Sequence, residues 1–238
     1  VLLTMPVLAR LLRAERTPQS VAEETQAVGM EGRHWTRRDV LHHWLFWLMV
    51  PVLLGPPAWG TALFFQQVHL TEVKGWALVD YVALMPLFTA VAVGATFAAG
   101  ALIDRFGSAV LAMLYMIPYV ISFCLMAAAE TLFGAALSLV VFALGAGIQA
   151  TVPAALWAEF FGTRHIGSVK ALSVSLMVFG SAIGPGISGV LIDWGLSFPQ
   201  QMWGYAVYFV VAGVVISFGL LRAQKLLPSA SEINVQSA

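Results

Sequence analysis

The 238-residue chain is 60% hydrophobic and only 10% charged, whereas about a quarter of the residues of soluble proteins are charged. This composition, with a mean hydropathy of +0.85, predicts a membrane protein. Twelve basic residues balance twelve acidic ones, which argues against a broad nucleic-acid-binding surface, and the single cysteine, Cys124, allows no intrachain disulfide.

Residues 1–40 precede the first long apolar window. The opening VLLTMPVLA is apolar but too short to span a bilayer, so we expect the end of a preceding, truncated helix. Its position ahead of the basic residues is the reverse of a secretory signal peptide. Residues 10–40 mix Arg, Glu, Gln, Ser and Pro without an apolar period, which predicts a cytoplasmic linker, with an interfacial helix near Trp35 to Trp44.

Six windows of 18 or more residues then follow without Lys, Arg, Asp or Glu, and windows of this kind predict membrane-spanning helices. They are Trp44–Phe65, Val82–Ile103, Ala109–Ala127, Leu132–Ala158, Ala171–Ile192 and Met202–Leu221. The predicted fold class is an all-α polytopic membrane protein, with a six-helix bundle over residues 41–227. The polar residues 228–238 predict a disordered cytoplasmic tail.

The basic residues indicate how the helices are oriented. Eleven of the twelve Lys and Arg side chains precede the first window, follow the last or lie in alternate gaps, and the remaining gaps hold only Lys74. Because positive residues are retained on the cytoplasmic side, we expect both termini in the cytoplasm and the chain in a cell membrane.

Two stretches of the sequence share the pattern Gly-x-Leu-Ile-Asp: GALIDRFGS at 100–108 and GVLIDWGLS at 189–197. The first closes the second window and the second closes the fifth, on opposite faces of the membrane. This arrangement predicts two inverted three-helix repeats, as found in secondary transporters. Trp194 replaces Arg105 in the second copy, at an interface where its amphipathic ring fits.

GALIDRFGS resembles the Gly-x-x-x-Asp-Arg-x-Gly loop motif of the major facilitator superfamily (MFS). AEFFGTRHIGSVKAL resembles a later cytoplasmic loop of that family, and GSAIGPGISGVLID resembles its eleventh helix. The resemblance extends from the linker through Leu221 and implies helices seven to twelve of a carrier, closest in style to bacterial monocarboxylate-porter-like proteins. It implies secondary active transport of a small solute by alternating access in the bacterial inner membrane. It implies no cofactor, and the implied partner is the N-terminal six-helix half, missing here, or a second copy.

The resemblance also implies a gating group at the cytoplasmic helix ends, and we expect it to contain Gly100, Asp104, Arg105, Gly107, Glu159 and Arg164. The alternative is that these charges only fix topology and the glycines only allow a turn. The second window carries no charge before Asp104, unlike animal monocarboxylate porters. A carboxylate substrate therefore lacks its expected cation here, so the other half supplies it or the substrate is neutral or more apolar.

Polar side chains inside the windows are candidates for a substrate path, because they are costly in lipid unless paired or functional. Gln149 and Thr151 lie near mid-span in the fourth window; Gln66, Gln67 and His69 lie at the end of the first. For the latter three the alternative is an ordinary membrane interface.

Small residues and prolines predict helix packing and hinges. Gly180, Gly184 and Ser188 follow an i, i+4, i+8 spacing with Pro185 among them, and Gly94 with Ala98 repeats it in the second window.

Catalytic and metal-binding patterns are not evident. His42 and His43 are adjacent and on a helix would not face one another, and no phosphate-binding GxxxxGK[ST] loop is present. We therefore expect no metal site and no enzyme. The alternative to a carrier is a non-transporting membrane protein, such as a truncated regulator or assembly partner, and transport by the chain would discriminate between them.

Overall fold

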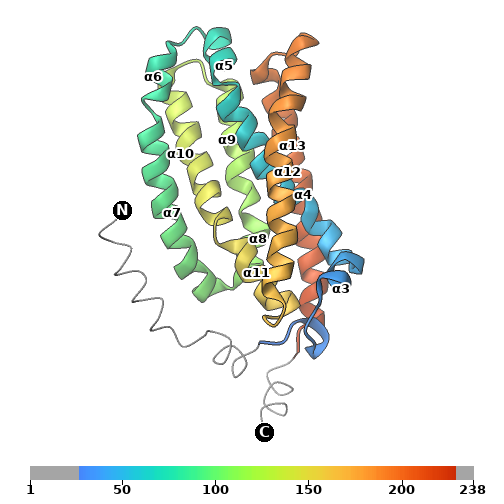
Figure 1. The fold of residues 1–238 in the computed structure, drawn as a ribbon. Coiled ribbons are helices and arrows are strands. Elements are labelled where there is room, and N and C mark those ends of the chain that lie inside the picture. The colour runs from blue at the N-terminus through green and yellow to red at the C-terminus, as the bar shows by residue number, and fades with distance from the viewer. Residues whose placement is uncertain (1–26, 229–238) are drawn as a thin grey trace, which may run out of the picture.

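Six long apolar spans stand side by side in the structure, a computed structural model that describes residues 27–228 (Figure 1). All six predicted membrane spans are confirmed. They are Trp44–Phe65, Leu78–Phe106, Ser108–Ala128, Leu132–Phe161, Ile166–Asp193 and Phe198–Leu226. The truncated helix predicted at residues 1–9, and the predicted tail from residue 229 on, lie outside the described residues.

Several spans are built from more than one helix, and short helices lie at the ends of the bundle. The helices are α3 (Arg37–His42), α4 (Trp44–Phe65), α5 (Gln67–Lys74), α6 (Leu78–Val82), α7 (Met85–Phe106), α8 (Ser108–Leu114), α9 (Met116–Ala128), α10 (Leu132–Gln149), α11 (Val152–Phe161), α12 (Ile166–Asp193) and α13 (Phe198–Ala223), with 3₁₀ turns at Met30–Gly32 (η1) and Gln224–Leu226 (η2).

Prolines explain why three spans are interrupted. Pro86, Pro118 and Pro153 each follow a break, between α6 and α7, α8 and α9, and α10 and α11. Proline has no N–H group, so the carbonyl four residues earlier loses its helical partner. The break before Pro153 leaves Gln149 as the last residue of α10, near the middle of its span.

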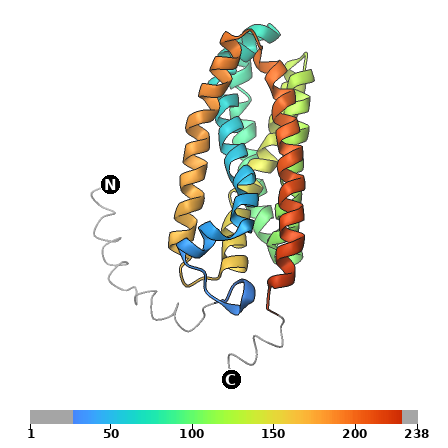
Figure 2. The same ribbon diagram turned by 90° about the vertical axis from the view of Figure 1, so that its right-hand side faces the viewer.

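The spans pack in two layers. In the first layer α7 packs on α10, and α4 packs on α12, while Phe142 of α10 joins the two pairs by contacting Gly60 and Phe64 of α4. Behind this layer, α9 and α13 pack on each other, and α9 also packs on α10 while α13 also packs on α4. Figure 2 shows α12 and α13 on opposite sides of the bundle. We call α7, α10, α4 and α12 the front row, and its side away from α9 and α13 the front face.

The packing pattern confirms the predicted inverted repeats. When the first three spans are matched in order to the last three, the α4–α12 contact corresponds to α10–α7, and α4–α13 corresponds to α10–α9. The α9–α13 contact corresponds to itself. The main contacts of the bundle therefore follow a pseudo-two-fold relationship between two three-helix units.

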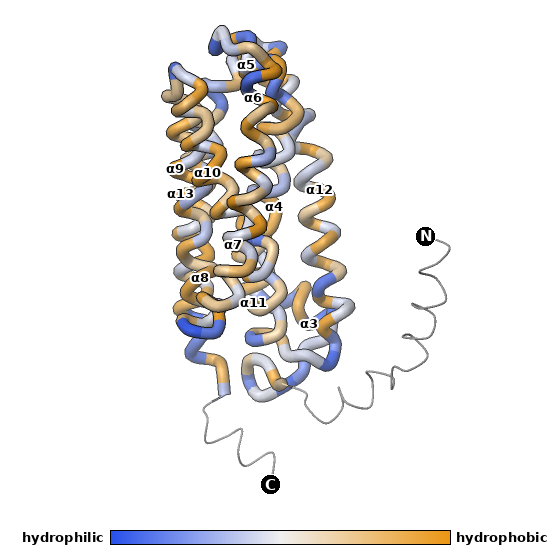
Figure 3. Tube along the Cα trace, turned by 90° about the vertical axis from the view of Figure 1, so that its left-hand side faces the viewer, coloured by the Kyte–Doolittle hydropathy of each residue, from blue (hydrophilic) through white to orange (hydrophobic). Residues whose placement is uncertain are grey.

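The most hydrophilic residues gather at the two ends of the bundle, and mainly apolar residues lie along its length (Figure 3). We call the end that carries residues 27–43 the linker end and the other the α5 end. Of the described basic residues, only Lys74 lies at the α5 end, where its ammonium donates hydrogen bonds to the carbonyl oxygens of Ala127 and Ala129. Burial lowers the pKa of Lys74.

The described part of the predicted linker is packed against the bundle. Trp35 is 2% exposed, its backbone N–H donates to the Phe161 carbonyl at 3.2 Å, and the Thr163 N–H donates to the Ala27 carbonyl at 3.0 Å. The helix expected near Trp35 is α3, which begins with a capping box between Thr36 and Asp39. Hydrogen bonds from Thr36 lower the pKa of Asp39.

Candidate functional site

A cavity of about 190 Å³ lies within the front row, between α4 and α10, with contributions from α7 and α9. It is lined by Pro56, Pro57, Gly60, Thr61, Phe64, Phe88, Tyr119, Phe142, Ala146 and Gln149. The lining includes one residue of the predicted substrate path, Gln149. The cavity therefore lies near the middle of the spans, where ligands bind in many helical carriers.

Aromatic rings form much of the cavity wall. The ring centroids of Phe64 and Phe88 are 5.4 Å apart, and that of Phe142 lies 6.3 and 6.0 Å from them. Tyr119 packs edge-on against Phe142 at 5.1 Å. These separations lie in the range that favours edge-to-face and offset packing, so rings from four helices hold the cavity in shape.

The cavity contains one amide whose orientation is fixed by a partner. The hydroxyl of buried Tyr119 donates a hydrogen bond of 2.6 Å to Oε1 of Gln149. Nε2 of Gln149 is not buried and has no hydrogen-bond partner among the described residues. The amide therefore presents N–H donors to the accessible space. Tyr119 lies 30 residues away, and sequence reasoning did not single it out.

Gln201 is a buried glutamine with a structural role, and its hydrogen bonds provide a comparison for those of Gln149. Its Oε1 accepts hydrogen bonds from Ser188 and Tyr205, and its Nε2 donates to the carbonyl oxygens of Ser188 and Leu196. Its hydrogen-bonding groups are thus used within the protein. Gln149, by contrast, keeps free donor capacity at the cavity.

The α4 wall of the cavity lacks a helical hydrogen bond at Pro56, and side chains of neighbouring helices stabilise it. Because Pro56 has no N–H, the Val52 carbonyl loses its helical donor; it accepts a hydrogen bond from the Tyr115 hydroxyl at 3.3 Å instead. The Tyr208 hydroxyl donates to the nearby Pro51 carbonyl at 2.7 Å. Tyrosines of α13 and of the α8–α9 junction therefore hold this proline-rich stretch in place.

The other predicted path residues do not line the cavity. Thr151 lies in the break between α10 and α11, Gln66 and Gln67 lie at the α4–α5 junction, and His69 lies in α5. Nε2 of His69 is buried and has no hydrogen-bond partner among the described residues. The structure thus brings Gln149 alone of this group to the cavity.

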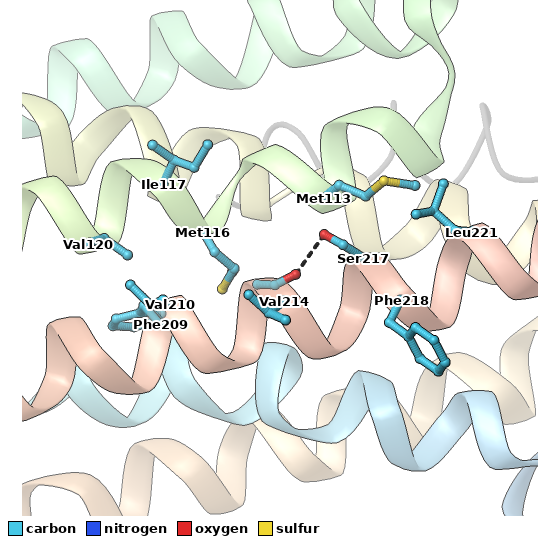
Figure 4. A pocket seen from close by; sticks show the side chains of 11 residues that line it. Met113, Met116, Ile117, Val120, Phe209, Val210, Val214, Ser217, Phe218 and Leu221 are labelled. Carbon is cyan, nitrogen blue, oxygen red and sulfur yellow. Dashed lines mark hydrogen bonds between the residues drawn. The ribbon is translucent and has the colours of Figure 1, made fainter.

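A larger pocket, of about 560 Å³, lies on the other side of the bundle between α9 and α13 (Figure 4). Its lining is almost wholly apolar, and its one hydroxyl, Ser217, is bonded to the Gly213 carbonyl at 2.7 Å. With no free polar group to orient a solute, this pocket is a weaker candidate for a substrate site than the smaller cavity.

The loop motif forms no ion pair with another described residue. Asp104 and Arg105 are exposed in the last turn of α7, and Arg33–Glu31 is the salt bridge found among the described residues. Gly107, with φ +84°, directly precedes α8, and the buried Ser108 that begins this helix donates a hydrogen bond to the Glu159 carboxylate of α11. The structure thus joins the predicted loop to Glu159 through a serine that the sequence did not point to. Gly100 lies in α7, one turn before Asp104.

Arg164 lies in the turn between α11 and α12, exposed to solvent. Its positive charge acts on His34 of the linker. Burial lowers the pKa of His34, and the positive charges of Arg164 and His165 lower it further. Burial also lowers the pKa of His43.

Small residues of α12 permit close packing on α4. A Cβ atom on Gly180 would lie 2.7 Å from the Leu54 carbonyl oxygen, and one on Gly184 would overlap the Ala58 backbone. Ser188 continues this buried face, and Pro185 lies within the helix. Gly94 does not pack in this way: it is exposed, and a Cβ there would meet nothing within 4 Å.

The close approach of α7 instead uses the neighbouring face of the helix. A Cβ on Gly147 of α10 would lie 2.5 Å from the Ala92 carbonyl oxygen and from the Ala95 Cβ. The residues of α7 that pack closely on a neighbouring helix are therefore Ala92 and Ala95, and not Gly94 as the sequence predicted. Small residues occur on two faces of α7, and only one of these faces contacts α10.

Metal chemistry has no support in the described residues, which contain no group of three or more His, Cys, Asp or Glu able to hold an ion. The fold and the cavity define a polytopic helical membrane protein with a solute-sized site between its spans. The chain belongs to the Major Facilitator Superfamily, whose sequence model matches residues 1–185. Members of this family carry small solutes across membranes. Searches of curated proteins and of solved structures gave no match.

Proposed function

We propose that the bundle is one of the two walls of a secondary active transporter, not an enzyme, and that it moves a small solute by alternating access. The observation that carries the proposal is the mid-span cavity within a front row whose outer helices are largely uncovered. Only 11% of the most apolar window of α6–α7 and 17% of that of α12 are buried, against 50% for α4. We expect a second bundle against the front face to cover these outer helices and to enclose the cavity between the two bundles.

The partner in this proposal is another six-helix bundle, supplied by the N-terminal half of a carrier or by a second copy of this chain. Exposed apolar side chains on both outer helices suit such a contact, among them Phe97 of α7 and Val178 of α12. The motifs GALIDRFGS and AEFFGTRHIGSVKAL support the assignment to helices seven to twelve. The stretches FFQQVH and LWAEFFGTRHIG support a likeness to bacterial monocarboxylate-porter-like carriers.

We place the linker end in the cytoplasm and the bundle in a cell membrane. Eight of the nine described basic residues lie at the linker end, and this asymmetry is what the positive-inside rule requires. The described ends of the chain, at residues 27 and 228, both lie at this end (Figure 1).

Gating in this proposal uses the loop motif. Asp104 and Arg105 are exposed at the cytoplasmic end of α7, where they are free to pair with a second bundle. Glu159 and Ser108 tie α11 to the start of α8, so movement of the loop is transmitted to the lower half of the fourth span. Gly100, Gly107 and Arg164 belong to the same end of the bundle.

Transport is tested with the full chain in proteoliposomes, with and without a proton gradient. We expect saturable uptake of at least one labelled small solute. If no solute is taken up by the chain, alone or with a co-expressed N-terminal half, the transport proposal fails and a non-transporting membrane protein is favoured.

Cysteine cross-linking tests the expected contact with a second bundle separately. In a Cys124→Ser background, Phe97→Cys on α7 is expected to form a disulfide with a second copy or to cross-link to the co-expressed half. Val214→Cys on the back of α13 is similarly exposed and serves as the matched control. Equal cross-linking at both positions would argue against a specific partner on α7.

A further inference from the structure

We propose that the cavity between α4 and α10 binds a small, uncharged aromatic solute whose polar group accepts a hydrogen bond, such as an aromatic amide or ketone. As a transport substrate this class rests on the proposed function, but its binding to the bundle does not. Three features of the cavity carry the proposal: the lack of charge, the aromatic wall and the oriented amide of Gln149.

Charge is absent both from the cavity lining and from the helix segments that form it. None of the ten lining residues is ionisable near neutral pH, and the windows Trp44–Phe65 and Leu132–Ala158 hold no Lys, Arg, Asp or Glu. An anion or cation entering this space would lose hydration without meeting a counter-charge, and that loss is costly in an apolar environment. The cavity therefore favours a neutral solute over either ion.

The aromatic wall favours a flat ring. Phe64, Phe88 and Phe142 meet at centroid distances of 5.4 to 6.3 Å and come from three different helices. A ring inserted among them makes edge-to-face or offset contacts with each. A volume of about 190 Å³ accommodates one substituted ring rather than a large drug-like molecule.

The orientation of Gln149 selects the polar group. The Tyr119 hydroxyl donates to Oε1 of Gln149, and the opposite amide orientation would leave that buried hydroxyl without this acceptor. Nε2 is therefore the atom that reaches the accessible space, and it offers N–H donors. A carbonyl oxygen or ring nitrogen of the solute can accept from it, whereas a second donor group there would find no partner on the amide.

Three probes of nearly the same shape test which charge the solute carries: neutral benzamide, anionic benzoate and cationic benzamidine. Binding to the full chain in lipid nanodiscs is measured by ligand-observed nuclear magnetic resonance titration. We expect saturable binding of benzamide and about tenfold or weaker affinity for both ions, since neither finds a counter-charge. If benzoate or benzamidine binds as tightly as benzamide, the uncharged class is wrong.

Variants test whether Gln149 is the group that recognises the probe. Gln149→Leu is expected to weaken benzamide binding about tenfold, because the hydrogen bond is lost in an apolar site. Gln224→Leu makes the same change at an exposed position of η2 and is expected to leave binding unchanged. If benzamide does not bind, or if both variants bind it equally well, the cavity assignment is overturned.

A variant that gains affinity for a probe must be folded, so it distinguishes lost recognition from lost folding. Gln149→Lys places a cation in the cavity and is expected to reverse the order, with benzoate binding more tightly than benzamide. An unchanged order would contradict the proposed site. Benzamide uptake into proteoliposomes is measured in parallel. Binding at Gln149 without uptake of benzamide or any other solute, alone or with the co-expressed N-terminal half, contradicts the transport proposal alone, and uptake of benzoate in place of benzamide contradicts the substrate class alone.

Discussion

Gly184 of α12 lies directly against the backbone of Ala58 in α4, and no space for a side chain separates the two helices at this point. Gly180, one turn earlier, makes the same kind of contact with Leu54. In a membrane, where lipid tails are as apolar as leucine, close packing of this kind is a main source of helix association. The α4–α12 pair therefore depends on these glycines.

We predict that Gly184→Val separates α12 from α4 and destabilises the bundle by about 1–3 kcal/mol or more, as overpacking does. Gly186→Val is the matched control, because it makes the same substitution two residues away, where a Cβ meets nothing within 4 Å. Unfolding in mixed micelles, followed by circular dichroism, measures both. Equal losses for the two variants would show that helix propensity, not contact with Ala58, sets the effect.

Tyr115 is predicted to stabilise the proline-rich part of α4. Tyr115→Phe removes the donor to the Val52 carbonyl and should cost about 1 kcal/mol. Pro56→Ala restores the helical N–H that this carbonyl lacks. We therefore expect Tyr115→Phe to cost less in a Pro56→Ala background. A double-mutant cycle on unfolding free energies measures this coupling, and strict additivity would contradict it.

Asp104 is predicted to act in transport but not in folding. It is exposed and has no salt-bridge partner among the described residues, so Asp104→Asn should change the unfolding free energy by less than about 0.5 kcal/mol. The same variant is expected to abolish solute uptake, because the carboxylate can no longer pair with a second bundle. Normal uptake kinetics with normal stability would exclude the gating role.

The sequence was sufficient for the spans and the repeat, because the spans follow from local composition and the repeat follows from a motif that recurs in the sequence. Lipid requires long uncharged windows, and these were confirmed in number and approximate bounds. The helices run further than the windows because charge does not end a helix: α7 continues through Asp104 and Arg105 until Gly107, whose φ of +84° ends it.

The site itself depends on contacts that composition does not specify. Gln149 stood out because an amide is rare in mid-span, but its partner Tyr119 belongs to another helix. Gly94 and Gly147 are both small, yet only Gly147 meets a neighbouring backbone. Which face of a helix packs is decided by the whole bundle, so small-residue spacing alone did not identify it.

The docking of the linker on α11 yields the last prediction. A Cβ on Gly29 would lie 2.5 Å from the Phe160 carbonyl oxygen and 2.7 Å from the Gly162 nitrogen. Gly29 has φ −91°, which any residue can adopt, so Gly29→Val acts by collision rather than backbone strain. We expect it to release residues 27–36 and to speed trypsin cleavage after Arg33 and its neighbours several-fold. Gly167→Val, where a Cβ meets nothing, should leave the cleavage rate unchanged, and the same acceleration in both variants would contradict a specific docking contact.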